Sequence, residues 1–259
     1  MSESRIGEPR SGAARQLGSL LKEVAIVVVG AIIVSSILRA FVAQPFVIPS
    51  GSMEDTLQID DKVVVQKVTD FSRGDVVVFV DPGNWLGPDY QAQERGPTGK
   101  LLEFVGLLPD TSSNHLIKRV IGMPGDTVTC CDAQQRITVN GEPLEEEDYL
   151  YRGSDGEPVA PAEVPFSVVV PADRIFVMGD HRDDSRDSRC HLGDVPAGGG
   201  PIGTDAFVPI ANVVGPAFLI AAPFDRFQRL TVPETFADVP DATEPAPQRA
   251  VIEPEGVGC

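Results

Sequence analysis

Two residues in this sequence have side chains that can act as a nucleophile and its base. Ser52 ends the stretch PSGS at 49–52, whose composition is typical of a turn. A serine hydroxyl is a poor nucleophile unless a base lies within hydrogen-bond reach. Lys118 lies in the apolar run LIKRVI at 116–121, where burial would lower its pKa from about 10.4 and leave a neutral amine near pH 7 to 8. Such an amine is a competent general base.

Histidine is the competing base. A triad would require His115, His181 or His191 beside Ser52, with a carboxylate to orient the ring. His181 lies in the aspartate-rich run GDHRDDSRDSR at 179–189. Both a Ser-Lys pair and a Ser-His-Asp triad are therefore open on these residues. The run follows an apolar segment, so it begins where a core ends and can present a hydroxyl to a site.

Strand candidates must position these groups. Successive side chains of a strand face opposite sides, so of the neighbours Lys118 and Arg119 one can be functional while the other is structural. Asn140-Gly141 predicts a hairpin turn. The segments rich in β-branched residues are 61–68, 74–80, 115–123, 136–144, 166–170 and 174–178. The apolar segment 212–224 is too short and too interrupted by Gly and Pro to span a membrane, and it predicts a buried strand pair.

An uncharged apolar run near the N-terminus predicts a membrane anchor over 24–42, interrupted only by Arg39. As a helix it would span about 28 Å, close to the hydrocarbon thickness of a bilayer. The preceding polar arm, residues 1–23, carries four basic residues spread along it, and the positive-inside rule puts such an arm in the cytoplasm. A cleavable signal peptide is disfavoured because no small-x-small pair follows the run, and a core helix is disfavoured because the run is apolar on all sides.

Composition and charge narrow the possible functions and the domain organisation. The chain has 259 residues, 42% of them hydrophobic, and a formal net charge of -17, which disfavours binding to nucleic acid. Its four cysteines form no CxxC pair, so a zinc site is poorly supported. We expect one β-rich domain over 43–230, with a Gly- and Pro-containing insert at 81–114. The acidic, proline-containing tail 231–259 has little apolar surface to bury and is expected to be disordered.

Four stretches in order resemble one family. They are PSGSMEDTL at 49–57, RGDVVVF at 73–79, IKRVIGMPGD at 117–126 and GDHRDDSRDSR at 179–189. The sequence resembles the bacterial type I signal peptidases, membrane-anchored serine proteases that remove signal peptides from exported proteins. The resemblance covers about residues 24–224. It implies a mostly β fold, in which an N-terminal transmembrane helix precedes an antiparallel β-rich catalytic domain with partly barrel-like sheets.

The resemblance also implies roles. Ser52 resembles the nucleophile, Lys118 the general base, Ser50 the oxyanion-binding hydroxyl and Ser185 the serine that orients the lysine. Two structural ion pairs are implied, Asp180 with Arg119 and Asp187 with Arg189. The positions that match the shallow substrate pockets, which would explain a preference for Ala-x-Ala, are Ile48, Met53, Leu57 and Leu116.

The family likewise implies no metal or cofactor. Its substrates are the signal peptides of exported preproteins, and it works at the bilayer of the plasma membrane with the catalytic domain outside. Asp55 stands where the family usually has proline, and His181 replaces the commoner asparagine. In an oxidising compartment we expect Cys190 to pair with Cys130 or Cys131, because a bond between those two neighbours would be strained.

Two other classes share some of these features. A soluble self-cleaving Ser-Lys repressor would need a DNA- or partner-binding N-terminal module, where this chain has an apolar segment. A membrane-anchored β-domain that binds exported chains without cleaving them would not need Ser52, Lys118 and Ser185 together.

Overall fold

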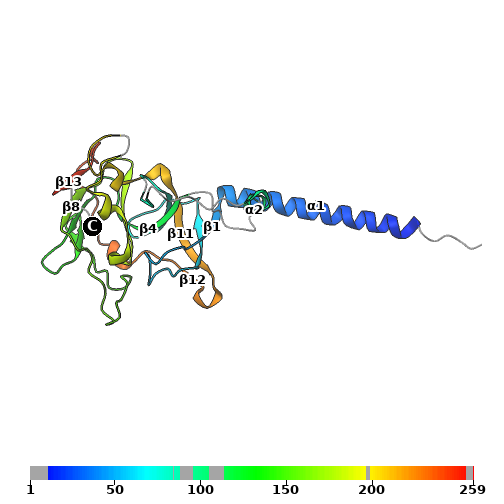
Figure 1. Cartoon of the computed structure of the whole chain (residues 1–259), viewed down its shortest axis with the longest axis horizontal. Coiled ribbons are helices and arrows are strands. Elements are labelled where there is room, and N and C mark those ends of the chain that lie inside the picture. The colour runs from blue at the N-terminus through cyan, green and yellow to red at the C-terminus, as the bar shows by residue number, and fades with distance from the viewer. Residues whose placement is uncertain (1–10, 84, 88–95, 105–113, 197–198, 255–258) are drawn as a thin grey trace, which may run out of the picture.

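A long helix projects from a β-rich body in the computed structural model (Figure 1). The structure describes residues 11–83, 85–87, 96–104, 114–196, 199–254 and 259. The chain leaves the helix directly into the first strand. The mostly β, antiparallel architecture expected from the sequence is confirmed.

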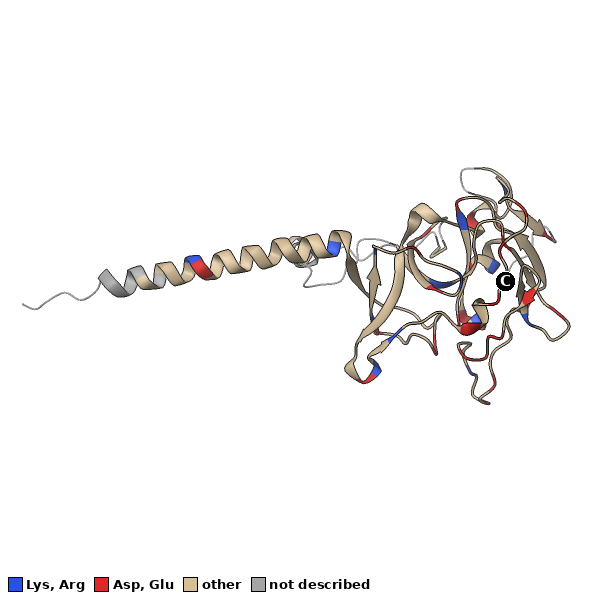
Figure 2. Ribbon diagram, turned by 180° about the vertical axis from the view of Figure 1, so that it is seen from behind, with Lys and Arg blue, Asp and Glu red and all other residues tan. Residues whose placement is uncertain are grey.

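Helix α1 (Ser11–Phe41) is longer than the predicted anchor. Its apolar part, Gly18–Phe41, is 24 residues long with a mean hydropathy of 2.5, and its most apolar stretch is not buried against the rest of the described chain. Figure 2 shows it free of charged residues between a charged pair near its start and a basic residue near its end. Because the apolar side chains are exposed all round, α1 is not a core helix of this domain.

The larger sheet carries the site. Its strand order is β1-β2-β11-β3-β4-β9-β10, with β12 paired to β11, and every pairing is antiparallel. The order does not close on itself, so among the described residues the sheet is open rather than a complete barrel. Its strands are β1 (Ala43–Val47), β2 (Lys62–Gln66), β3 (Val76–Val80), β4 (His115–Gly122), β9 (Arg174–Met178), β10 (Val208–Pro209), β11 (Val213–Ala222) and β12 (Gln228–Arg229).

The smaller sheet lies at the end of the body farther from α1 (Figure 1). Its order is β13-β8-β5-β6-β7, formed by β5 (Thr127–Cys130), β6 (Ile137–Val139), β7 (Glu142–Pro143), β8 (Phe166–Val169) and β13 (Val251–Glu253). The turn between β6 and β7 is made by Asn140 and Gly141, both with positive φ, as the sequence predicted.

The remaining elements are short helices. They are α2 (Pro97–Phe104), η1 (Arg182–Asp184), η2 (Ser188–His191), η3 (Thr204–Ala206), η4 (Ile210–Asn212), η5 (Phe224–Arg226) and η6 (Glu234–Phe236). Helix α2 covers the first part of the apolar piece within the insert, and residues 105–113 lie outside the described residues.

The prediction of a strand pair over 212–224 is wrong. Strand β11 is one ten-residue strand that pairs with β3 at its start and with β2 further along. The change of partner falls near Gly215, where φ is +151° and a side chain would collide with the backbone of Gln66. Glycine at this position therefore lets one strand join the two halves of the sheet.

The prediction of a disordered tail is also wrong. Strand β13 pairs with β8, and Phe236 and Val239 are buried in the core beside the smaller sheet. The backbone N–H of Ala172 donates to the carbonyl of Pro247 at 2.8 Å. A low overall hydrophobicity was a poor guide here, because two well-placed apolar side chains and a paired strand suffice to hold the segment against the sheet.

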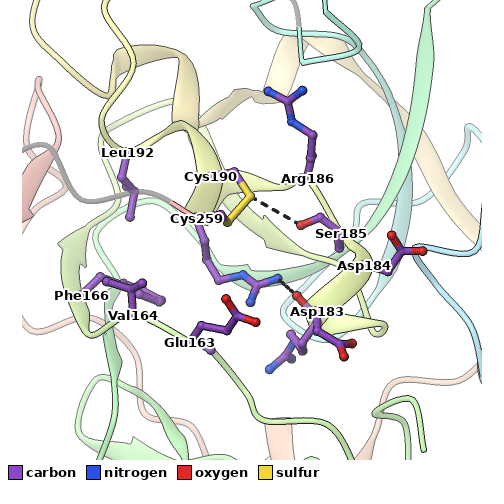
Figure 3. Close-up of a pocket in the computed structure, with 13 residues that line it drawn as sticks. Glu163, Val164, Phe166, Asp183, Asp184, Ser185, Arg186, Cys190, Leu192 and Cys259 are labelled. Carbon is purple, nitrogen blue, oxygen red and sulfur yellow. Dashed lines mark hydrogen bonds between the residues drawn. A yellow bond between two sulfur atoms is a disulfide. The ribbon is translucent and has the colours of Figure 1, made fainter. Parts of the chain in front are cut away.

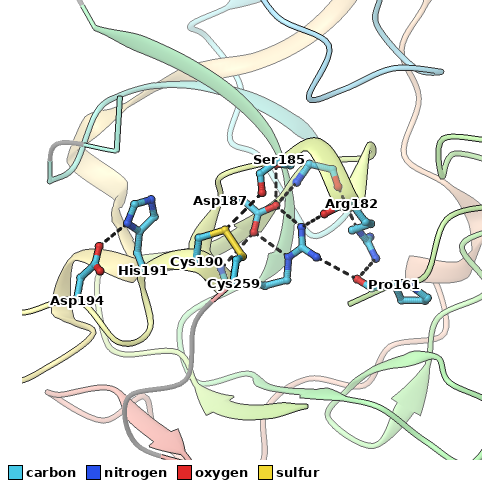
Figure 4. Close-up of a disulfide and its surroundings, with 10 residues drawn as sticks. Pro161, Arg182, Ser185, Asp187, Cys190, His191, Asp194 and Cys259 are labelled. Carbon is cyan, nitrogen blue, oxygen red and sulfur yellow. Dashed lines mark hydrogen bonds and ion pairs between the residues drawn. A yellow bond between two sulfur atoms is a disulfide. The ribbon is translucent and has the colours of Figure 1, made fainter. Parts of the chain in front are cut away.

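The expected cysteine pairing is wrong as well. Cys130 is bonded to Cys131, and Cys190 is bonded to Cys259 across 69 positions (Figure 4). The second bond became possible because the tail returns over the body and brings residue 259 beside the segment that follows Asp187. The expectation of a disordered tail gave no reason to pair Cys259 with Cys190.

Candidate active site

Ser52 and Lys118 meet in the centre of the larger sheet. Nζ of Lys118 donates a hydrogen bond to Oγ of Ser52 at 2.5 Å, although 66 positions separate them. Ser52 lies in a series of tight turns, in which the N–H of Glu54 donates to the carbonyl of Gly51 and that of Leu57 to the carbonyl of Met53. Lys118 lies in the middle of β4. A rigid turn and a central strand thus hold the two side chains against each other.

Burial changes the acidity of Lys118. Its side chain is 3% exposed, and loss of solvation lowers its pKa from 10.5 to about 8, an effect that nearby Asp187 and Asp180 partly oppose. The charge of Arg189, which pairs with Asp187, adds to the lowering of this pKa. A substantial fraction of Lys118 is therefore neutral at mildly alkaline pH and can accept a proton.

Both ion pairs expected from the resemblance are present. Arg119 holds Asp180 with two hydrogen bonds, of 2.8 and 2.5 Å, and its guanidinium also lies 4.3 Å from the centre of the Tyr149 ring. Arg189 holds Asp187 in the same two-pronged way, at 2.9 and 2.8 Å. Each pair is almost completely buried, which suits a structural role because removing either partner would leave an unpaired charge.

Ser185 differs from what the resemblance implied. Its Oγ donates to Oδ2 of Asp187 at 2.8 Å, and no hydrogen bond joins it to Lys118 in the described part of the chain (Figure 4). The same Asp187 oxygen accepts the backbone N–H of Gly179 at 2.8 Å. The Asp187 carboxylate, whose negative charge raises the pKa of Lys118, is a stronger partner for this hydroxyl than an amine that already bonds Ser52.

Gly179 permits this close packing. A side chain there would collide with the Ser185 side chain and with the carbonyl oxygen of Ser52. The loop that begins at Gly179 therefore lies directly against the turn that carries Ser52, and the backbone N–H of His181 donates to the Ser52 carbonyl at 3.2 Å. Glycine before an aspartate-rich loop is a signal that sequence reasoning had available and did not use.

Ser50 lies on the exposed side of the nucleophile. Its Oγ is 3.5 Å from Oγ of Ser52. It is more exposed than Ser52. The geometry thus puts a second hydroxyl beside the reactive one.

The histidine triad is not formed. Nδ1 of His181 lies 3.1 Å from the carbonyl oxygen of Gly51 and 3.3 Å from a Glu54 carboxylate oxygen, and its ring stacks on Tyr151. His191 is also remote, since its Nδ1 lies 2.6 Å from Oδ2 of Asp194 and its ring stacks on Trp85. His181 thus supports the backbone of the turn rather than the Ser52 hydroxyl.

A groove of about 260 Å³ opens beside the Ser-Lys pair. It is mostly apolar, and the residues that line it include Ile48, Ser52, Leu86, His115, Leu116 and Lys118. Two predicted pocket residues, Met53 and Leu57, do not line it. Both are fully buried in the core beneath the turn, because the turn directs them inward while Ser52 faces the groove.

Asp55 replaces the family's proline in a position where proline would not fit. Its φ is +30°, whereas the proline ring requires φ near −65°. Its carboxylate accepts the backbone N–H of Arg152 at 3.0 Å. Aspartate therefore fastens this turn to the segment that follows Leu150.

Sequence reasoning missed two further features. Leu86 reaches the groove from the insert, where nothing in the local pattern marks it. A second cavity of about 190 Å³ lies behind the aspartate-rich loop, beside the Cys190–Cys259 bond (Figure 3). Its wall includes Ser185 and Arg186 from the loop and Phe166 from β8.

A serine hydroxyl that is hydrogen-bonded to a buried lysine of lowered pKa is the arrangement expected of a Ser-Lys hydrolase. Comparison with known proteins then gives the family. The model of "Signal peptidase, peptidase S26" matches residues 21–222. The chain belongs to the peptidase S26 family of signal peptidases, and it is a serine endopeptidase.

Curated relatives agree over most of their length. The chain is 37% identical to the probable signal peptidase I of Mycobacterium leprae, covering 87% of this chain and 83% of the relative. It is 35% identical to signal peptidase I of Mycobacterium tuberculosis, and the match covers 81% of this chain and 75% of the relative. It is 30% identical to signal peptidase I of Leptolyngbya laminosa, and that match covers 77% of this chain and 78% of the relative. A solved signal peptidase I from Enterococcus faecalis is 23% identical with a TM-score of 0.34, over 57% of this chain and 97% of its own.

Proposed function

We propose that Ser52 and Lys118 perform the cleavage. Neutral Lys118 takes the proton of Ser52 as the Ser52 oxygen attacks the carbonyl before the scissile bond, and protonated Lys118 then gives that proton to the leaving amine. A water activated by Lys118 hydrolyses the acyl-enzyme and releases the signal peptide. The observation that carries this proposal is the 2.5 Å hydrogen bond between two buried side chains, one of which has a lowered pKa.

Ser50 is proposed to stabilise the oxyanion together with the backbone N–H of Ser52. The Ser50 hydroxyl lies 3.5 Å from that of Ser52, and Ser50 lines the same groove. A single donor of this kind contributes about 3 to 4 kcal/mol to transition-state stabilisation. Ser185 acts on Lys118 indirectly, since its hydrogen bond fixes the Asp187 carboxylate whose charge bears on the amine.

The substrate is proposed to be the cleavage region of an exported preprotein, bound in extended form in the groove beside β4. The groove is largely apolar and lies next to Ser52, so it suits small apolar side chains such as alanine. No metal or cofactor takes part.

The membrane topology follows from charge. Residues 1–23 form the cytoplasmic arm, α1 crosses the plasma membrane from about 24 to 42, and the peptidase domain from 43 onward lies outside. The short connection from α1 to β1 keeps the larger sheet close to the membrane surface, where the signal peptide of a preprotein is held.

Cleavage of a preprotein by the full-length chain in detergent or lipid vesicles tests the assignment. Ser52→Ala and Lys118→Ala are each expected to lower kcat/KM by at least about a thousandfold. Ser72→Ala, at an exposed serine, and Lys62→Ala, at an exposed lysine, are the matched controls and should cleave normally. Near wild-type cleavage by Lys118→Ala would end the proposal, and loss of cleavage in His181→Ala with the fold intact would reopen the histidine alternative. A chain that binds preproteins without cleaving them would show no difference between wild type and Ser52→Ala.

A further inference from the structure

The insert that follows β3 begins with a compact, self-anchored turn. One carboxylate oxygen of Asp81 accepts the backbone N–H groups of Gly83 at 3.0 Å and Trp85 at 2.9 Å, and the other accepts that of Leu86 at 3.1 Å. Three N–H donors on one carboxylate fix the backbone at Gly83, Trp85 and Leu86. Leu86 is therefore held in place by the backbone.

Trp85 anchors the same turn in the protein core. Its side chain is 2% exposed, its indole N–H donates to the carbonyl of Asp205 at 2.9 Å, and its ring stacks on His191 with centroids 4.6 Å apart. Phe79 of β3 contacts it edge-on at 5.7 Å. A buried aromatic with a satisfied N–H is a firm attachment, so the next residue, half-buried Leu86, faces the groove from a rigid support.

The insert that carries Leu86 leaves β3 beside His115, at the end of β4 away from Lys118. The backbone N–H of Asp81 donates to the carbonyl of Asn114 at 2.8 Å, and the adjacent Val80 pairs with His115. Lys118 is three residues further along β4 than His115, which corresponds to roughly 10 Å at the rise of a strand. Leu86 and the Ser-Lys pair line one groove, and the turn that carries Leu86 begins at the His115 end of β4.

We propose that Leu86 is a specificity-determining residue that limits the size of the substrate side chain at position −3, counting back from the scissile bond. This inference rests on the proposed roles of Ser52 and Lys118. An extended substrate advances about 3.3 Å per residue, and alternate side chains share a face. If the side chain at −1 lies beside Ser52, the one at −3 lies about 7 Å further along the groove, toward His115 and Leu86.

The test compares preproteins that differ at one position. Full-length wild type and Leu86→Ala are assayed with substrates bearing Ala or Leu at −3, and separately with Ala or Leu at −1. Leu86→Ala is expected to raise the relative kcat/KM for Leu at −3 by at least about tenfold, while the discrimination at −1 stays within about twofold. Leu86→Phe is expected to act in the opposite direction, and wild-type selectivity should return in Leu86→Met. Asp81→Ala should relax the −3 selectivity as Leu86→Ala does, because it frees the turn.

Leu230→Ala is the matched control, because Leu230 is a half-buried leucine that does not line the groove, and it should leave both ratios unchanged. Unchanged −3 selectivity in both Leu86→Ala and Leu86→Phe would overturn the inference, as would an equal change at −1 and −3. The Ser52→Ala variant separates this inference from the proposed site. If Ser52→Ala still cleaves, the Ser-Lys assignment is wrong. If Ser52→Ala is inactive but the Leu86 variants keep the wild-type −3 selectivity, only the role of Leu86 is wrong.

Discussion

Replacing the buried lysine with a neutral side chain of similar length should inactivate the enzyme and at the same time stabilise it. Lys118 is almost fully buried, and burial lowers its pKa from 10.5 to about 8. A folded-state pKa below the unfolded-state value means that the unfolded chain binds the proton more tightly. The charged amine therefore opposes folding wherever both states are protonated, and Lys118→Met removes that opposition.

The magnitude follows from the pKa difference. A fall from 10.5 to about 8 corresponds to about 3 kcal/mol at pH 7, at about 1.4 kcal/mol for each pKa unit. As the pH rises from 8 to 10.5, the folded state loses its proton before the unfolded state does, so the wild-type protein recovers this free energy. The advantage of Lys118→Met should therefore shrink to below about 1 kcal/mol at pH 10.

The assay is denaturant unfolding of full-length wild type and Lys118→Met in detergent, with the disulfides intact, at pH 7 and pH 10. Lys62→Met, at an exposed lysine of β2, is the control and should change stability little at either pH. A Lys118→Met protein that is less stable than wild type at pH 7, or equally shifted at both values, would refute the reasoning that a costly buried charge supplies the base.

Three further outcomes are expected. The kcat/KM should rise about fivefold between pH 7 and 8 and then level off, because the neutral fraction of Lys118 follows a pKa of about 8; a flat profile in a pH-rate measurement would contradict this. Gly179→Ala should lower kcat/KM more than tenfold and lower the free energy of unfolding by about 1 to 3 kcal/mol, because the added methyl group would collide with the Ser185 side chain and the Ser52 carbonyl. Wild-type kinetics in this variant would show that the loop has room for the methyl group. Phe236→Ala should cost about 3 to 5 kcal/mol in denaturant unfolding, because that side chain is buried in the core, whereas no loss would mean that the tail is not held.

Some site residues could be identified from short stretches of sequence, whereas the contacts of others depend on how distant segments pack. The residues alone left Ser52 open to a lysine or a histidine partner, and the resemblance of four separate stretches to one family favoured the lysine. Met53 and Leu57 were misplaced because the direction of a side chain in a series of tight turns depends on what packs beneath it. Ser185 was assigned to the correct loop, but its partner depends on where the Asp187 oxygens point.

The tail, residues 231–259, also shows the difference between what composition indicates and what tertiary contacts decide. Its composition indicated that it could not form a core of its own, and by itself it does not, because its buried residues use a core built by β5, β6 and β8. Pairing of β13 with β8 and the bond from Cys190 to Cys259 both depend on a surface that exists only after the smaller sheet has formed.

The sequence by itself determined the apolar helix, the antiparallel strands, the turn that carries Ser52 and the class of chemistry, because periodicity, turn residues and side-chain type are properties of short segments. Only the tertiary structure decided that Lys118 is buried against Ser52, that Leu86 of the insert borders the groove beside them, and that the tail is part of the domain. These facts depend on contacts between segments far apart in the chain, whose free energy is set by burial and distance rather than by any local pattern.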